Sequence, residues 1–216
     1  MIKYTSIFSL LFTFLFQSVQ AQTSPDSSIM KKEFDNLDDA LKNPQNVLRL
    51  NLSNQKFQIP DSIWLKFVNL QYLSLKNDHL KKLPEGIGNL KNLKVLDLSG
   101  NDFSMLPTTF TQLSNLEELY LNDDKKFRFD KNIPILRKLP KLKSLHIEND
   151  GLQKLPKNIF QLDNIESLYL NKNRFKKIPL EIKELKNLKY LDLQDNKFKI
   201  PSQNIQDIDY GLKIIF

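Results

Sequence analysis

The residue types that could perform chemistry in this chain gather around one histidine. His146 stands between Ser144 and Glu148 in a Ser-x-His-x-Glu pattern, and these are the side-chain types of a nucleophile, a base and an orienting carboxylate. Alternate side chains of one strand project in parallel, so we do not expect Ser144 and His146 to approach within about 3 Å. The other histidine, His79, lies in a predicted turn, and the chain has no cysteine. We therefore predict a polar surface role for His146 and no enzymatic activity.

Metal and cofactor binding are not expected either. A metal at His146 would need further ligands, which Glu118 and Ser167 on the neighbouring strands do not clearly supply. The acids within residues 123–130 lack an oxygen-ligand spacing suited to calcium. The five glycines form no phosphate-binding loop. The sequence thus predicts a protein without a metal or a cofactor.

The elements that would position these residues follow from a repeat of 23 residues. One unit reads Leu-Lys-Val-Leu-Asp-Leu-Ser-Gly-Asn over 93–101, and a similar unit spans 188–196. The two-residue step between leucines predicts a short strand with alternating side chains. A following Leu-Pro or Ile-Pro pair, with apolar residues three apart, predicts a 3₁₀ or short helical return. Seven units begin at the same apolar position: Val47, Leu70, Leu93, Leu116, Leu142, Ile165 and Leu188.

One unit cannot fold alone, because its buried side chains contribute ~10–20 kcal/mol while ordering ~23 residues costs ~30 kcal/mol. Stacking supplies the missing burial and pairs neighbouring strands in parallel. The pattern L-x-x-L-x-L-x-x-N over 47–201 resembles the leucine-rich repeat family, in the 23-residue Leu-Pro-x-x-Ile/Phe subclass, and an exported bacterial-type member of it. The resemblance implies an α/β solenoid, with a curved parallel sheet on the concave face and short helical or 3₁₀ returns on the convex face. It also implies a scaffold that binds another macromolecule.

The ninth position of each unit should bond the backbone of adjacent coils. Its residues are Gln55, Asp78, Asn101, Asp124, Asp150, Asn173 and Asn196. An amide both donates and accepts, whereas an ionised carboxylate only accepts. We therefore predict imperfect hydrogen-bond ladders at Asp78, Asp124 and Asp150.

The first residues predict a secretory signal. Lys3 precedes an apolar run over 7–16, and Val19 and Ala21 fit the small-residue cleavage positions. The run is too short for a membrane-spanning helix. We expect cleavage after Ala21, export to the periplasm or out of the cell, and no stable membrane anchor.

The domain organisation follows from these signals. We predict a signal peptide at 1–21, a flexible lead-in at 22–28, an N-terminal capping helix at 29–46, seven repeats at 47–201 and a C-terminal cap at 202–216. Helical spacing of apolar residues, from Phe34 to Leu41, indicates the first cap.

The charges of the strands exclude one class of partner. The strand positions expected on the concave face carry six bases and eight acids, a balance of −2. After loss of Lys3, the chain holds 31 Lys and Arg against 25 Asp and Glu, a balance of +6. The remaining surface therefore carries about +8, whereas a nucleic-acid groove would be the more basic region. We predict that nucleic acid is not a partner.

Tyrosines gather at the middle of the predicted sheet. Tyr120, His146 and Tyr169 fall at the same position of consecutive strands. Tyrosine supplies a large contact area at a low entropic cost and is enriched at the centres of interfaces, although it is also simply a good strand residue. The predicted partner-binding residues are Tyr72, Glu118, Tyr120, His146, Glu148, Tyr169 and Tyr190.

The fourth unit carries three extra residues within 123–132. We expect one of Phe127 and Phe129 to replace the missing core leucine, and the other to form a loop contact with the partner near the tyrosines. A loop variation without function is the alternative.

These observations predict a monomeric, non-enzymatic, exported recognition scaffold that binds another protein through the concave sheet. The alternative is a module for glycan or cell-wall polymer, in which the rings stack on sugars and the basic turns hold acidic groups. A structural spacer without a partner is the third reading.

Overall fold

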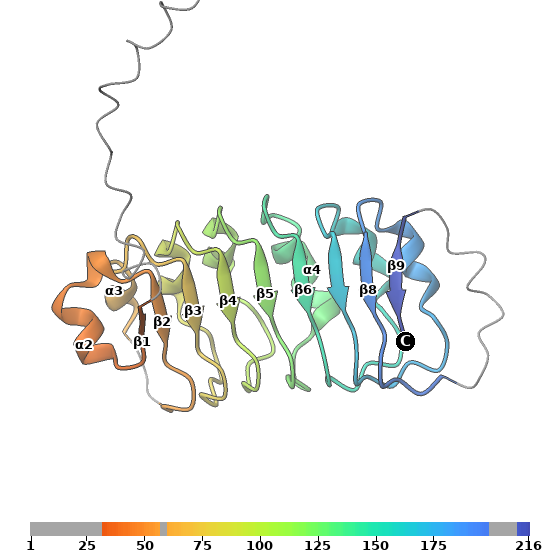
Figure 1. Ribbon diagram of the computed structural model, residues 1–216, viewed down its shortest axis with the longest axis horizontal. Helices are drawn as coiled ribbons and strands as arrows, with labels where there is room; N and C mark the ends of the chain where they lie inside the picture. The colour runs from red at the N-terminus through yellow and green to blue at the C-terminus, as the bar shows by residue number, and fades with distance from the viewer. Residues whose placement is uncertain (1–31, 57–59, 199–210) are drawn as a thin grey trace, which may run out of the picture.

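The computed structural model describes residues 32–56, 60–198 and 211–216. Within these ranges nine strands form one parallel sheet whose spatial order is the chain order (Figure 1). The strands are β1 (Glu33–Phe34), β2 (Arg49–Asn51), β3 (Tyr72–Ser74), β4 (Val95–Asp97), β5 (Glu118–Tyr120), β6 (Ser144–His146), β7 (Ser167–Tyr169), β8 (Tyr190–Asp192) and β9 (Lys213–Ile215). Each of the seven predicted units contains one of the strands β2 to β8.

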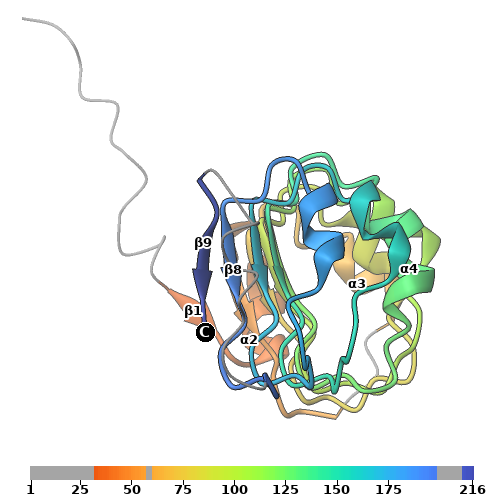
Figure 2. The ribbon, with the colours of Figure 1, turned by 90° about the vertical axis from the view of Figure 1, so that its right-hand side faces the viewer.

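Short helical segments return the chain on the wall opposite the sheet (Figure 2). They are α3 (Asp61–Trp64), η2 (Glu85–Asn89), η3 (Thr108–Gln112), α4 (Phe129–Leu136), η4 (Lys157–Gln161) and η5 (Leu180–Glu184). All but α4 begin directly after a proline. Backbone N–H groups at the start of a helical turn have no acceptor within the turn, so a proline, which lacks this group, costs no hydrogen bond there. The predicted solenoid, with a curved parallel sheet on the concave face and short returns on the convex face, is confirmed.

One apolar core runs along the solenoid. The central leucine of every strand from β2 to β8 is fully buried, and these leucines are Leu50, Leu73, Leu96, Leu119, Leu145, Leu168 and Leu191. Ile87, Phe110 and Ile159 meet them from the returns and are equally buried. Full burial stabilises by roughly 1.5–3 kcal/mol for each such side chain. Because adjacent coils cover one another's leucines, this stabilisation belongs to the stack and not to any one coil.

The N-terminal cap differs from the predicted helix. Phe34 lies in β1, which pairs with β2, and α2 (Leu37–Lys42) begins only at Leu37 with Asn36 as its N-cap. A 3₁₀ turn, η1 (Pro44–Asn46), follows. The strand gives the first coil a hydrogen-bonded neighbour, which a helix could not do. Phe34, Leu37 and Leu41 still pack on the core.

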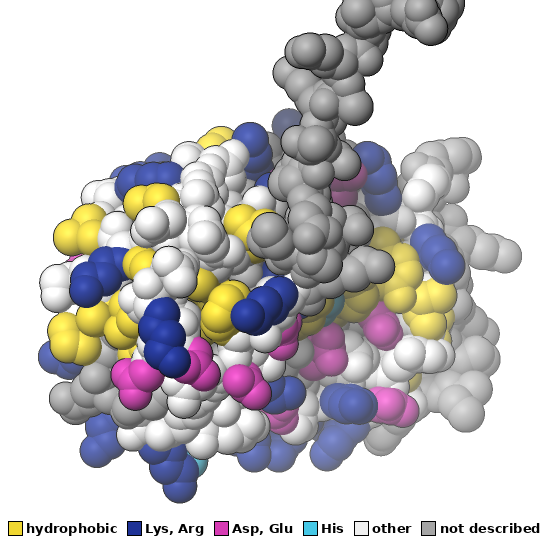
Figure 3. Space-filling view, turned by 60° about the vertical axis from the view of Figure 1, so that its left-hand side comes forward, with side chains coloured by type: hydrophobic (Ala, Val, Ile, Leu, Met, Phe, Trp, Pro, Cys, Tyr) yellow, Lys and Arg dark blue, Asp and Glu magenta, His cyan; other side chains and the backbone are white. Residues whose placement is uncertain are grey.

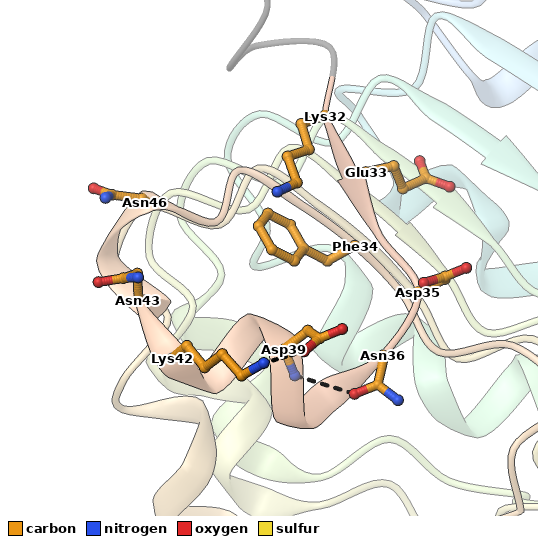
Figure 4. A pocket seen from close by; sticks show the side chains of 9 residues that line it. All are labelled: Lys32, Glu33, Phe34, Asp35, Asn36, Asp39, Lys42, Asn43 and Asn46. Carbon is orange, nitrogen blue, oxygen red and sulfur yellow. Dashed lines mark hydrogen bonds and ion pairs between the residues drawn. The ribbon is translucent and has the colours of Figure 1, made fainter.

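A hollow of about 540 Å³ lies between β1 and α2, at the N-terminal end of the solenoid. Figure 4 shows the ring of Phe34 at its centre, with the Lys32 ammonium 4.4 Å from the ring centroid. The Lys42 ammonium pairs with Asp39 at 2.6 Å on the other side. The residues that line the hollow are mostly polar and exposed, and we treat the hollow as part of the N-terminal cap and not as a ligand site.

At the other end, β9 pairs with β8, and Leu212 and Ile214 pack against the core. The predicted signal peptide (1–21) and lead-in (22–28) lie outside the described residues. Among the residues that the structure describes, no helix has the length and apolar character needed to cross a bilayer.

The three extra residues of the fourth unit change the return into α4. Phe129 is only 5% exposed and supplies the missing core side chain. This confirms the expectation that either Phe127 or Phe129 replaces the core leucine. Phe127 is half-buried and packs edge-to-face on Phe103, with ring centroids 5.9 Å apart. The buried Phe129 therefore does not make the expected loop contact, and for the half-exposed Phe127 this contact stays a prediction. Asn132, fully buried in α4, accepts the N–H of Leu106 at 2.8 Å.

The ninth position of each unit forms the predicted ladder, with defects. Asn101 donates from Nδ2 to the carbonyl oxygens of Leu98 at 2.7 Å and Leu75 at 2.8 Å. Asp124, at the same place in its coil, is 1% exposed, and neither carboxylate oxygen has a hydrogen-bond partner within the described residues. Asp150 accepts the Asp124 N–H at 2.6 Å through Oδ1, but its Oδ2 also lacks a partner. The ladder is imperfect at these two of the three predicted acids. At the third, Asp78, Oδ1 accepts the backbone N–H groups of Gln55 at 2.8 Å and Lys56 at 3.4 Å.

Burial makes these carboxylic acids hold their protons. Burial first, and then the charge of Asp150, raises the pKa of Asp124 from 3.8 to about 8. Burial likewise raises the pKa of Asp150 to about 7, and it raises that of Asp78 as well. At neutral pH Asp124 is therefore mainly protonated, and a neutral carboxyl can donate one hydrogen bond as asparagine does.

These pKa values predict a stability that falls as the pH rises. The unfolded chain releases these protons near pH 4, whereas the folded protein holds them until about pH 7 to 8, so alkaline conditions favour unfolding. The double variant Asp124→Asn with Asp150→Asn should be more stable at pH 8 by on the order of 2 kcal/mol, because each amide regains donors worth ~1 kcal/mol per bond. Urea unfolding across this pH range measures the difference between the two proteins.

The matched control is Asp163→Asn, which removes an acid from the exposed surface. It should leave the pH dependence as it is in the wild type. A double variant whose advantage over the wild type shrinks as the pH rises would contradict the assignment of neutral carboxyl groups.

Candidate functional site

Three rings stack across the middle of the concave face. Parallel pairing places Tyr120, His146 and Tyr169 side by side on β5, β6 and β7. The ring centroids of Tyr120 and His146 are 3.9 Å apart with an interplanar angle of 16°, and those of His146 and Tyr169 are 4.0 Å apart at 6°. Strands lie ~4.8 Å apart, so flat side chains at one repeat position can come into van der Waals contact face to face. We call Tyr120, His146 and Tyr169 the ring stack.

Two glutamates fix the ring stack. His146 Nε2 lies 2.9 Å from Glu118 Oε1, and His146 Nδ1 lies 3.2 Å from Glu148 Oε1. The Tyr120 hydroxyl donates to the same oxygen of Glu118 at 2.7 Å, and the amide of Asn171 donates to Glu148 Oε2 at 3.2 Å. These bonds fix the orientation of the Tyr120 and His146 rings, and Tyr169 packs face to face on His146.

His146 is 6% exposed, so the predicted surface role is wrong. The rings of Tyr120 and Tyr169 cover its two faces, and carboxylates take both nitrogens. Its nitrogens bond to Glu118 and Glu148, and its ring packs between the two tyrosines, so the imidazole is part of the packing of this face.

The electrostatics keep the tyrosines neutral. Burial, followed by the hydrogen bond to Glu118, raises the pKa of Tyr120 above its usual range, and burial raises the pKa of Tyr169. The hydrogen bond from His146 lowers the pKa of Glu148. The site therefore offers tyrosine hydroxyls that remain protonated at neutral pH, close to the ionised carboxylate of Glu148.

Two further tyrosines flank the ring stack. Tyr190 on β8 lies 5.1 Å from Tyr169, tilted by 44°. Tyr72 on β3 stands two strands before Tyr120 and carries the guanidinium of Arg49 at 4.0 Å from its ring centroid. All four tyrosines are half-buried, which leaves part of each ring available to a partner.

The structure brings together six of the seven predicted site residues on β5 to β8 and the turn after β6. These are Glu118, Tyr120, His146, Glu148, Tyr169 and Tyr190, whereas Tyr72 stands apart. Asp97 and Asp192 continue the ring stack on either side at the same repeat position, and we call these five residues the concave column. The repeat already places both acids in this column, but they were not among the predicted partner-binding residues.

In the view of Figure 3, acidic, basic and hydrophobic side chains are interspersed over the surface toward the N-terminal end. In the described ranges no group of three or more histidines and acids is arranged to hold a metal ion.

Two family models match the chain. One is described as leucine-rich repeat region and matches residues 45–134, and the other is described as leucine rich repeat and matches residues 140–198. A comparison with curated proteins found no match.

Several solved structures are similar to the chain. A leucine-rich repeat protein of Leptospira interrogans is 27% identical, with a TM-score of 0.56, over 86% of this chain and 58% of that one. The plant peptide hormone receptor RGFR1, in complex with RGF2, is 28% identical, with a TM-score of 0.50, over 77% of this chain and 26% of that one. TLR13, in complex with ssRNA13, is 26% identical, with a TM-score of 0.64, over 83% and 26%. The chain thus spans less than two thirds of the length of each.

The geometry predicts that Glu118 supports the ring stack. Glu118→Ala should lower the free energy of unfolding by about 1–3 kcal/mol, because it leaves His146 and the Tyr120 hydroxyl without their shared acceptor. Glu118→Gln, which keeps an acceptor oxygen, should lose less. Denaturant unfolding measures both.

The adjacent Glu117 is exposed and serves as the matched control. Glu117→Ala should change stability by no more than ~0.5 kcal/mol. Equal effects of the two alanine variants would mean that Glu118 does not hold the rings.

Proposed function

The chain is a leucine-rich repeat protein, and on that premise we propose that it is a non-catalytic scaffold that recognises another protein through its concave face. The repeats of this family typically serve protein interaction and are generally not catalytic. We further propose that the protein acts as a monomer and that the ring stack is the centre of the contact.

The observation that carries this proposal is the order of the ring stack. Its rings are fixed by packing and by Glu118 and Glu148, so little rotamer freedom remains to be lost when a partner binds. The half-exposed tyrosine edges present apolar area and hydroxyl groups together, a combination common at interface centres.

Relatives of known ligand support a binding role without naming the partner. The similar plant receptor is bound to RGF2, and the similar TLR13 is bound to ssRNA13. The concave acids of this chain, among them Glu118, Glu148 and Asp192, would repel a nucleic-acid backbone, so we keep the prediction that nucleic acid is not the partner.

A glycan or cell-wall polymer is the second candidate. The flat rings of Tyr120 and Tyr169 could stack on sugars, and the basic turns, such as Lys176 and Lys177, could hold acidic groups. An acidic polymer would have to pass the concave carboxylates to reach the rings, which favours the protein partner.

We also propose export, on the basis of the signal sequence at 1–21. The mature protein should begin at Gln22, because Val19 and Ala21 fit the cleavage positions. Mass spectrometry of the protein purified from its native cells measures the first residue. A mature chain that still begins at Met1 would contradict the proposal.

Crosslinking from the concave face tests the partner. A photoreactive benzoylphenylalanine in place of Tyr190, beside the ring stack, should capture a protein in native cells, and the same group in place of Phe160 on the convex return should not. In the background of Tyr120→Ala with Tyr169→Ala, capture should fall about tenfold or more, since such anchors contribute ~2 kcal/mol.

Protease and glycosidase digestion of the captured product separates the two candidates. If only protease reduces the mass of the crosslinked product, the partner is a protein, and if glycosidase reduces it, the partner is a glycan. Equal capture from both positions, or capture unchanged by the double variant in protein that is still folded, would reject the ring stack as the site.

A further inference from the structure

Two tyrosines of the concave face already hold cations of this chain. The Arg49 guanidinium lies 4.0 Å from the ring centroid of Tyr72 and donates to Glu33 at 2.8 and 3.1 Å. The acid, the cation and the ring come from β1, β2 and β3 in that order. The Lys213 ammonium lies 5.8 Å from the ring of Tyr190. The protein thus contains its own example of a guanidinium held between a ring and a carboxylate.

Each end of the ring stack offers a ring and a carboxylate without the cation. Asp97 on β4 lies beside Tyr120, and Asp192 on β8 lies beside Tyr169. In each aspartate, Oδ1 accepts the backbone N–H two residues later at 2.9 Å. Asp192 is 9% exposed, yet within the described part of the chain neither aspartate has a basic side chain within ion-pair distance.

Both terminal rings of the stack are half-buried, so part of each is accessible to a ligand. Asp97 is shorter than Tyr120 beside it, so the outer face of Tyr120 extends beyond this carboxylate. At the other end Tyr190 lies 5.1 Å from Tyr169, so a cation beside Asp192 would contact both of these rings. After burial and other causes, the charge of Asp97 also raises the pKa of Tyr120, and that of Asp192 raises the pKa of Tyr169, which agrees with this closeness. A tyrosine face attracts a cation, and an adjacent carboxylate adds a charge-assisted hydrogen bond.

Lysines on the neighbouring strands do not cancel this negative charge. Lys143 and Lys189 both pair with Glu166, at 2.9 and 2.7 Å. Glu166, a carboxylate outside the column, therefore balances one of these two positive charges. Glu118 and Glu148 lie next to the column, within hydrogen-bond distance of His146, and add to the negative potential around the ring stack.

We infer that the concave face recognises a polypeptide segment with two cationic side chains, one held over Tyr120 beside Asp97 and the other against Tyr169 and Tyr190 beside Asp192. The inference rests on the proposed function and specifies its partner as a basic segment. Arginine fits better than lysine, because a planar guanidinium can stack on the ring and donate to the carboxylate at once, as Arg49 does.

The strands set the spacing of the two cations. From β4 to β8 there are four strand spacings, which amount to about 19 Å at ~4.8 Å each. An extended segment rises ~3.3 Å per residue, so the two cations should be about six residues apart. Because side chains of an extended segment alternate, an even separation places both on the side that faces the sheet.

Binding of synthetic peptides to the full protein tests this inference. The probe is an uncharged serine-rich peptide with two arginines six residues apart, and its controls carry citrulline at both positions or the two arginines adjacent. Isothermal titration should detect the probe at millimolar or tighter affinity and find each control at least about tenfold weaker. The citrulline peptide carries no positive charge for either ring or carboxylate, and the peptide with adjacent arginines can reach only one of the two sites.

Protein variants locate the contact. Asp97→Asn and Asp192→Asn should each weaken the probe about fivefold, whereas the matched surface control Asp163→Asn should leave it unchanged. Failure to bind the probe, equal binding of the citrulline peptide, or unchanged affinity in both aspartate variants would overturn the inference. Should any of these occur while crosslinking at Tyr190 still depends on the ring stack, the proposed function stands and only the basic partner is rejected.

Discussion

No coil of this protein can bury its own leucines, so the coils must stack to cover them, and this stacking determines both the sheet and its exposed surface. The leucines at the strand centres are fully buried only because each coil has a neighbour on both sides, or a cap. Stacking also fixes the strand spacing, and it aligns equal repeat positions across the whole sheet. The side chain at one repeat position therefore lies next to the side chain at the same position of the next coil.

The ring stack is a consequence of that alignment. Tyr120, His146 and Tyr169 lie 26 and 23 residues apart in sequence, yet their ring centroids are 3.9 and 4.0 Å apart. The extra three residues of the fourth unit do not disturb this, because α4 absorbs them on the opposite wall while β5 and β6 keep their register. The same alignment has a cost at Asp124 and Asp150, where carboxyl groups occupy places that suit an amide.

The sequence predicted the strands, their parallel register and the order of the concave column, because all three depend on a period that can be counted. It did not predict the burial of His146. That burial depends on the rings of Tyr120 and Tyr169 covering both faces of the imidazole, and on Glu118 and Glu148 bonding to its nitrogens. Phe34 was misplaced because a few apolar residues fit either a helix or a strand that leads into one. Phe127 packs on Phe103 because the altered return, which no period describes, brings them together.

Hydroxyl-radical footprinting, with and without the partner captured from cells, tests the proposal that the concave column holds the partner. Labelling of Tyr169 and Tyr190 should fall several-fold in the complex, while labelling of the exposed Phe160 on the convex return should be unchanged. Protection of Phe160 with unchanged labelling of the two tyrosines would contradict it.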